Sequence, residues 1–481
     1  MKNINKKLVQ ILESFSAKEI REFRKFISSP FFTKGRNYIP FLNEILKAIS
    51  KKQFKPEKKV SKEIDKLSDQ TIRNRYWELY KLAEDFIIFK DLSENTVERN
   101  RILLRNLTGK KLYSSFNLRL KETLKMLDKE KFSIKKHQDV SYFSLLNLEY
   151  LQDNDDAKHY FRESFEISKN DFSYDLLNFF EIGIEIIVNL RYKFKLDAEY
   201  IQDFLKELKI TKVISRFENS DSVNEKVTAM YYYLYKAFEN QDEEKFYYRS
   251  RKIFNETYNM LCDSFKISTF HHMINYCIIK RNEGLFLINY ELFRLFNEKL
   301  DQDLTPELKY GHNLFNHFRS YVHVGISIKE YKWVEDFILK YSDSLPSEIR
   351  ESEVKLTYAK LNFAKNKFEE TLSYLDGVRT KKYQQYTDIS QLKLCSFFEL
   401  QKYEDAFSEI DKLLHYMRNH KEITENFYTY NMNFLKYYQK ILKFKMNTEK
   451  LNPGFTIKEI ESQNKIARKE WLLEKLKELD C

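Results

Sequence analysis

The segment KYEDAF at Lys402–Phe407 is the third of three related hexapeptides, after KWVEDF at Lys332–Phe337 and KFEETL at Lys367–Leu372. Successive copies start 35 residues apart. This is the length of one helix-turn-helix unit, which cannot bury its apolar face alone and therefore stacks on its neighbours. Two further columns share the spacing and are predicted to be core, namely Val324, Ala359 and Leu394, and Ile328, Phe363 and Phe398.

The opening of the second predicted helix in each unit resembles a known repeat. Tyr403-Glu404-Asp405-Ala406 is similar to the Tyr-Glu-x-Ala pattern of the tetratricopeptide repeat family. This resemblance implies helical hairpins stacked into an array in the C-terminal half. Thr371 and Asp336 stand where the other two hexapeptides would carry the alanine.

We expect three regions along the chain. Residues 1–135 form a basic N-terminal helical domain, in which the capping box Ser16–Glu19 starts a helix that Pro30 ends. Residues 140–445 form the repeat array, and residues 456–481 form one amphipathic capping helix after the Asn452–Gly454 break. The motifs SSPFF, WVEDFI and LPSEIRE are similar to an uncharacterised bacterial helical-repeat family, and this resemblance implies architecture but no activity. They occupy Ser28–Phe32, Trp333–Ile338 and Leu345–Glu351.

Composition supports an all-α fold of stacked antiparallel helical hairpins. The 481 residues include only 8 Gly and 6 Pro, whereas strand-rich folds need turn residues every few positions. With 42% apolar and 32% charged residues, the chain can bury a large core and stay soluble. Four cysteines without a C-x-x-C pair, and no stretch that predicts a signal peptide or membrane span, lead us to expect a cytoplasmic protein without membrane contact.

The positive charge is concentrated near the N-terminus. Residues 1–140 hold 33 Lys and Arg against 18 Asp and Glu, so the remainder of the chain is slightly acidic. Clustered lysines of this kind would bind a polyanion, or they are exposed to solvent and have no partner. Arg73 and Arg75 would be the groove-reading residues of a helix-turn-helix. The predicted polyanion-binding residues are Lys51, Lys52, Lys55, Lys58, Lys59 and Lys62.

Motifs for catalysis or cofactors are missing from the sequence. The gaps between Cys262, His271, His272 and Cys277 fit no zinc spacing, and a glycine-rich phosphate loop, H-E-x-x-H and a nucleophile elbow do not occur. We therefore predict no catalytic residues, no cofactor and no metal. The favoured hypothesis is a non-enzymatic scaffold or adaptor that binds a peptide or partner protein on its repeat surface. The alternative is a regulator that binds nucleic acid through the basic N-terminal third and senses a ligand with the repeats.

Overall fold

The all-α class is confirmed. The computed structural model describes residues 6–50, 64, 67–191, 197–240, 243–309, 314–378, 380, 382–420 and 422–480. It is 82% helical, and the described residues contain no β-strand. None of the described helices combines the length and the apolar character that a membrane crossing requires.

The chain divides into two compact units. Unit 1 comprises Met1–Asn178 and Ser222–Thr228, and unit 2 comprises Phe179–Asp221 and Ala229–Cys481. The limits at residues 135, 140 and 445 were predicted for the N-terminal domain and the repeat array. The division into compact units does not test where repeats begin and end, so these limits stay predictions.

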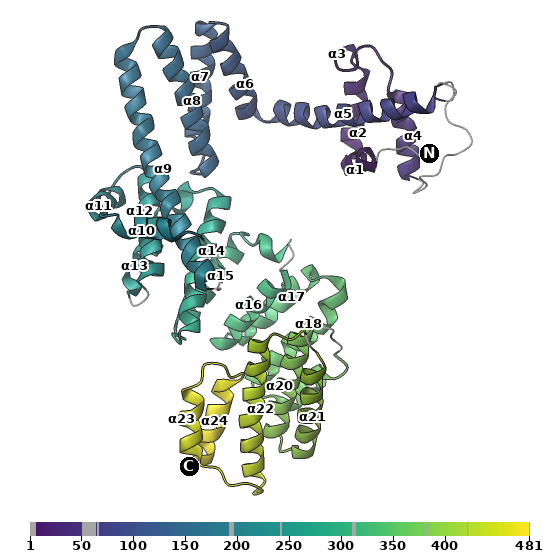
Figure 1. The fold of residues 1–481 in the computed structure, drawn as a ribbon, viewed down its shortest axis with the longest axis vertical. Coiled ribbons are helices and arrows are strands. Elements are labelled where there is room, and N and C mark those ends of the chain that lie inside the picture. The colour runs from purple at the N-terminus through teal and green to yellow at the C-terminus, as the bar shows by residue number, and fades with distance from the viewer. Residues whose placement is uncertain are drawn as a thin grey trace. The chain divides into compact units, whose positions relative to one another are not determined.

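Unit 1 contains a helical bundle followed by longer helices (Figure 1). Phe23, Leu42 and Leu79 lie in the bundle's core, and a second core contains Leu104, Phe116 and Phe143. The predicted capping box is present, since Glu19 N–H donates to Ser16 Oγ and Ser16 N–H donates to the Glu19 carboxylate. The helices are α1 Lys6–Ser14, α2 Ala17–Ser28, α3 Pro30–Thr33, α4 Ile39–Ser50, α5 Asp69–Glu94, α6 Thr96–Gly109, α7 Tyr113–Asp128, α8 Ile134–Asp153 and α9 Ala157–Arg191, the last of which continues into unit 2.

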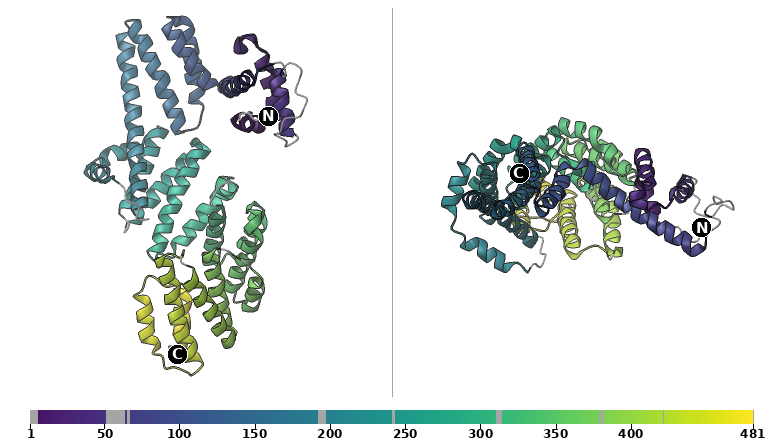
Figure 2. Two further views of the ribbon diagram at one scale, coloured as in Figure 1. Left: turned by 45° about the vertical axis from the view of Figure 1, so that its right-hand side comes forward. Right: turned by 90° about the horizontal axis from the view of Figure 1, so that it is seen from above.

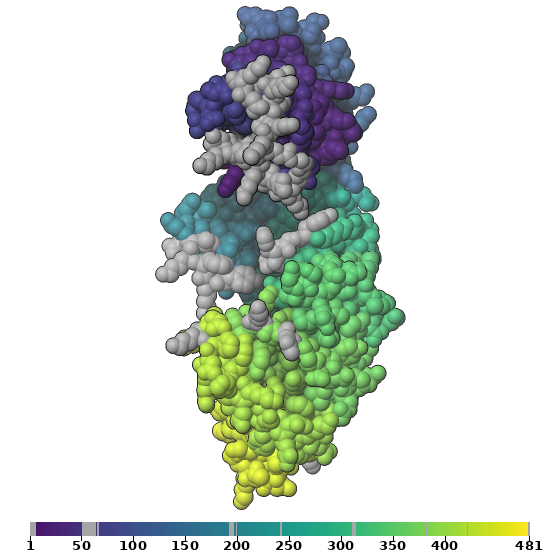
Figure 3. All heavy atoms as spheres, turned by 90° about the vertical axis from the view of Figure 1, so that its right-hand side faces the viewer, coloured from purple at the N-terminus to yellow at the C-terminus, as the bar shows by residue number. Residues whose placement is uncertain are grey.

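Unit 2 contains the stacked hairpins. Helices α14, α16, α18 and α20 each pack against the helix that follows, and α16, α18 and α20 also contact one another in that order. The chain from α16 to α24 forms a closely packed green-to-yellow body (Figures 2 and 3). The helices are α10 Glu199–Glu207, α11 Thr211–Glu218, α12 Val223–Glu239 (which begins in unit 1), α13 Glu244–Thr257, α14 Asp263–Asn282, α15 Ile288–Asp301, α16 Leu314–Ser327, α17 Tyr331–Tyr341, α18 Ser347–Ala364, α19 Phe368–Leu375, α20 Tyr383–Glu399, α21 Tyr403–Asn419, α22 Glu425–Lys445, α23 Pro453–Glu461 and α24 Lys469–Asp480, with the 3₁₀ turns η1 Tyr258–Met260, η2 Pro306–Leu308 and η3 Ser342–Ser344.

Several helix pairs are joined by one kind of corner. After Asn366, Lys367 N–H donates to the Asn362 carbonyl at 2.9 Å and Asn366 N–H donates to the Phe363 carbonyl at 3.0 Å. This pair of bonds is a Schellman motif. Its central residue adopts left-handed backbone angles and is most often glycine. Seven corners of the described chain share these bonds and place a non-glycine residue there, with φ between 52° and 65°: Lys111, Asp155, Asp303, Lys329, Asn366, Gln401 and Asn447.

The corners correct the predicted register of the first hexapeptide. The left-handed residues Asn366 and Gln401 are 35 positions apart, but Lys329 precedes Asn366 by 37. Val334 is therefore the structural equivalent of Thr371 and Ala406, and all three are fully buried. Asp336, which the 35-residue alignment placed there, is exposed and bonds to Lys332. The Lys-aromatic-acidic pattern marks the start of an amphipathic helix to within about a turn and does not fix its register.

Burial confirms most of the predicted core columns. Val324, Ala359, Leu394 and Phe398 are buried. Phe363 is half-buried, packs edge-on against Phe368 and contributes to two adjacent cores. The column therefore lies partly in the core and partly at its edge.

The predicted single capping helix from Thr456 to the end of the chain is wrong. The chain forms α23 and α24, and residues 462–468 between them are not α-helical. These residues bond to α22 instead, since Ala467 N–H donates to the Tyr430 carbonyl and Asn433 Nδ2 donates to the Lys465 carbonyl. Trp471, at the start of α24, is buried against Phe398 and Tyr438. Packing on α22 thus replaces helical hydrogen bonds in this segment.

Candidate partner-binding site

The six lysines of the predicted polyanion patch lie outside the described residues: Lys51, Lys52, Lys55, Lys58, Lys59 and Lys62. The two arginines considered for groove recognition bond within unit 1. Arg75 donates to Glu78 Oε2 at 2.9 Å, and Arg73 donates to Gln70 Oε1 at 3.0 Å. Each guanidinium therefore has a hydrogen-bond partner within the bundle.

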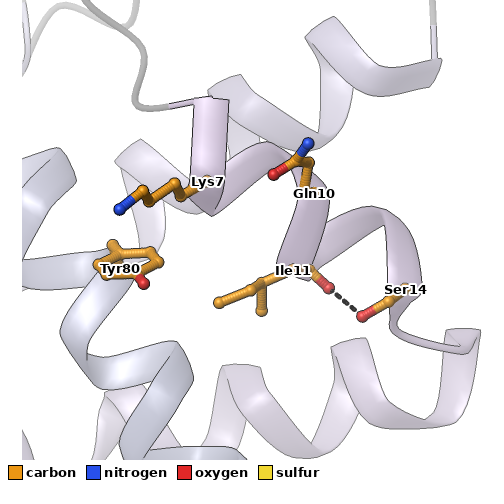
Figure 4. A pocket seen from close by; sticks show the side chains of 5 residues that line it. All are labelled: Lys7, Gln10, Ile11, Ser14 and Tyr80. Carbon is orange, nitrogen blue, oxygen red and sulfur yellow. Dashed lines mark hydrogen bonds between the residues drawn. The ribbon is translucent and has the colours of Figure 1, made fainter. Parts of the chain in front are cut away.

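A hollow of about 450 Å³ lies in unit 1 between α1 and α5 (Figure 4). It is lined by Lys7, Gln10, Ile11, Ser14 and Tyr80. The Ser14 hydroxyl donates to the Ile11 carbonyl at 2.7 Å, as a local helix bond. The lining lacks the convergent polar groups and paired acids and bases that a reaction or a tight small-molecule site requires.

A group of charged residues gathers in unit 2 around His323 of α16. We call it the cationic cluster. It consists of Arg281 from α14, Arg319 and His323 from α16, Glu353 and Lys360 from α18, Asp388 from α20, and Arg468, which precedes α24.

His323 lies among the charged side chains of the cationic cluster. Its side chain is open to water, but the surrounding protein and the charges of Arg281, Lys360 and Arg468 lower its pKa to about 4. Asp388 acts in the opposite direction and does not outweigh them. At neutral pH, His323 is therefore uncharged.

Two of the four permanent cations have carboxylate partners. Arg319 donates two hydrogen bonds to the Glu353 carboxylate, from Nε at 2.5 Å and from Nη2 at 2.7 Å. Gln385 Nε2 also donates to this carboxylate, at 2.8 Å. Lys360 Nζ donates to Asp388 Oδ2 at 2.8 Å. Burial raises the pKa of Asp388, but the positive charges of Lys360, Arg468 and Arg319 together lower it by more. The pKa of Asp388 therefore lies below its ordinary value.

Arg281 and Arg468 differ from these. Within the part of the chain that the structure describes, neither guanidinium has a carboxylate oxygen within 4.0 Å. Burial lowers the pKa of Arg281, and no neighbouring acid counteracts this effect. Arg468 donates through Nε to the side-chain oxygen of Gln391 at 3.4 Å, and its guanidinium lies 5.8 Å from the centre of the Phe363 ring.

The C-terminal segment brings Arg468 to the cluster. Residues 462–468 pack on α22, and Arg468 itself has a left-handed φ of 52°. Its partner Gln391 is buried and held by a bond from its Nε2 to Asn431 Oδ1 at 2.6 Å. A non-glycine residue in this conformation costs about 1 kcal/mol. The surrounding bonds therefore hold Arg468 in a defined place.

The cysteines and histidines considered as metal ligands have other roles. His272 Nε2 lies 3.5 Å from Glu181 Oε1, and Cys277 is buried beside the Tyr247 hydroxyl. Burial raises the pKa of the Cys277 thiol, so it is an inert core residue. Among the described residues, no group of three or more His, Cys, Asp and Glu side chains is placed to hold a metal ion.

Comparison with protein-family models, with curated proteins and with solved structures finds no match to this chain. The cationic cluster was not predicted from the sequence. Its members span residues 281 to 468. Sequence spacing places Arg319 with His323, and Glu353 with Lys360, on one helical face each, and it relates none of the other members. The remaining contacts depend on how the hairpins stack.

Proposed function

We propose that the chain is a tetratricopeptide-like helical-repeat scaffold that binds a partner protein or peptide at the cationic cluster of unit 2. One observation carries this proposal: among the described residues, Arg281 and Arg468 have no carboxylate partner, although the neighbouring cations Arg319 and Lys360 have one each. A partly desolvated guanidinium without a carboxylate partner loses hydration that neutral contacts restore only in part. A bound partner with anionic groups would supply the missing interaction.

The stacked helices support a role in binding. Helices α16, α18 and α20 contact one another and carry most of the cluster on consecutive hairpins, so a bound segment would meet several repeats at once. Repeat arrays use extended surfaces of this kind for protein recognition. We propose no reaction for this site, and we propose that the protein acts in the cytoplasm. The architecture of stacked hairpins also favours a scaffold.

The test is recovery of the tagged full-length protein from its own host, with and without nuclease. The wild type should retain a reproducible protein partner after nuclease treatment. Changing both Arg281 and Arg468 to glutamate should remove that partner. The matched control changes Lys412 and Arg418 to glutamate, which are exposed residues of α21 away from the cluster. Recovery of nucleic acid alone, or equal recovery by both double variants, would contradict the proposal.

A further inference from the structure

We propose that the segment bound at the cationic cluster is an acidic peptide, and that Arg281 and Arg468 receive two of its anionic groups. This inference rests on the proposed function and adds the chemistry of the partner. It follows from the charge count, the surroundings of the two arginines and the acids already present.

The charge count sets the number of anionic groups. The cluster holds four permanent cations, Arg281, Arg319, Lys360 and Arg468, against the two carboxylates Glu353 and Asp388. Both carboxylates are engaged by their own partners, Arg319 and Lys360. The excess of two positive charges therefore coincides with the two unpaired arginines. Two negative groups on a partner would balance it.

The surroundings of Arg468 suit a planar anion beside an apolar side chain. Its Nε is directed to Gln391, and within the described residues no acceptor bonds to its two terminal nitrogens. A guanidinium presents such a pair of donors to a carboxylate or phosphate in bidentate fashion. The Phe363 ring lies beside the guanidinium, and Arg319 and Lys382 lie over the ring of Phe315, at 4.6 and 4.2 Å from its centre. Aromatic surface next to the donors favours a peptide with both acidic and apolar residues.

The same features disfavour nucleic acid at this place. Nucleic-acid binding needs several cations along a row of phosphates. Proteins that make about six to ten phosphate contacts lose affinity by about a thousandfold or more as the salt concentration rises. Here the surplus is two charges, or three with Lys382 beside Phe315, and Asp388 stands among the cations with part of its surface open to water. A phosphate backbone would meet this carboxylate directly. An isolated peptide side chain can avoid it.

The test uses the full-length protein and labelled peptides that carry two glutamates at increasing separation in a serine and leucine background. Matched peptides carry glutamine or phosphoserine at the same positions, and a labelled single-stranded RNA is included. Fluorescence anisotropy at about 0.15 M salt measures the dissociation constants, so that nonspecific attraction is screened. We expect the glutamate or phosphoserine peptides to bind and the glutamine peptides to bind at least about tenfold more weakly.

Variants locate the binding. Arg281→Gln and Arg468→Gln should each weaken binding by about tenfold or more, whereas Arg418→Gln on α21 should change it less than about twofold. Arg468→Lys keeps the charge but not the paired donors, and should lie between wild type and Arg468→Gln. Thermal unfolding of each variant verifies that it folds. Arg281→Lys makes the same conservative change on α14 and should lie between wild type and Arg281→Gln, so the result does not depend on any single variant.

The outcomes separate the two proposals. Preference for carboxylate or for phosphate supports the inference and identifies the source of the anionic oxygens. Equal binding of glutamine peptides, or no peptide binding by a protein that still captures its cellular partner through the cluster, overturns the acidic-peptide inference but leaves the scaffold intact. Tight binding of RNA that depends on Arg281 and Arg468 overturns both.

Discussion

Arg281 and Arg319 lie in the same cluster but differ in their partners, and their substitution should therefore have opposite effects. Glu353 is 1% exposed in its side chain and depends on Arg319. Arg319→Met should cost about 3 kcal/mol, because it leaves a buried carboxylate with only Gln385. Arg281→Met removes a partly buried charge without a partner and should raise stability by about 0.5 kcal/mol. Urea unfolding at pH 7 measures both, and equal destabilisation would show that Arg281 has a structural role.

His323 predicts how acid affects unit 2. Its pKa is about 4 in the folded chain and 6.5 as an ordinary value, so the unfolded chain binds the proton more readily. Stability is therefore lost as the pH falls from about 6.5 towards 4. His323→Gln should remove about 1 kcal/mol of this loss between pH 7 and pH 5, after allowance for the open side of the ring. His415→Gln on α21 is the control, and urea midpoints at both pH values give the comparison. An unchanged acid sensitivity would contradict the lowered pKa of His323.

At the scale of single residues, the sequence predicted which residues are buried better than it predicted which charged residues lie together. The core positions Ala359, Leu394 and Phe398 were predicted from the repeat spacing, because burial follows helical periodicity. The sequence could not show that Arg281 and Arg468 approach His323. That proximity depends on the packing of hairpins far apart in the chain and on the irregular path of residues 462–468.

At the scale of elements, the corners joining the helices make a direct prediction. Lys329 has a φ of 65°, where a side chain costs energy that glycine avoids, whereas the next residue, Glu330, has a φ of −80°. Lys329→Gly should therefore stabilise the protein by about 0.5 kcal/mol, the relief of strain exceeding the added entropy of the unfolded chain. Glu330→Gly should destabilise it by about 0.5 to 1 kcal/mol, because only the entropic effect remains. Thermal midpoints of both variants test the pair, and the same sign for both would contradict the corner geometry.

The corners also explain where sequence analysis failed at this scale. Glycine is the usual sequence signal for a helix stop, but Lys, Asp, Asn and Gln occupy the left-handed positions of these corners, so the sequence does not mark them. Alignment then relied on the amphipathic starts of the second helices, and the first hexapeptide was displaced by two residues. In the C-terminal segment, tertiary bonds from α22 broke a helix that periodicity predicted as continuous.

At the scale of the whole molecule, the uneven charge separates the scaffold from the nucleic-acid-binding alternative. If the predicted lysines contact phosphates, the full chain should bind duplex DNA or RNA with log affinity falling against log salt, at about −0.9 per phosphate neutralised on B-DNA. Changing Lys51, Lys52, Lys55, Lys58, Lys59 and Lys62 to glutamine should flatten the slope by about one unit per lysine engaged. We expect weak binding that disappears near physiological salt. Anisotropy titrations measure it, and sequence-selective binding that persists at about 0.2 M salt would favour the regulator.

The position of Arg468 in the chain has a consequence for synthesis. A ribosome completes Arg281, His323, Lys360 and Asp388, with the hairpins that carry them, before it reaches the segment at residues 462–468. Chains fold largely in the order in which they emerge, so a nascent array can be stacked while its cluster still lacks one arginine. A message interrupted upstream of this segment would yield a helical product that lacks both Arg468 and the part of the core that Trp471 and Leu472 supply. Recognition of a partner would then begin only after the last helix has docked.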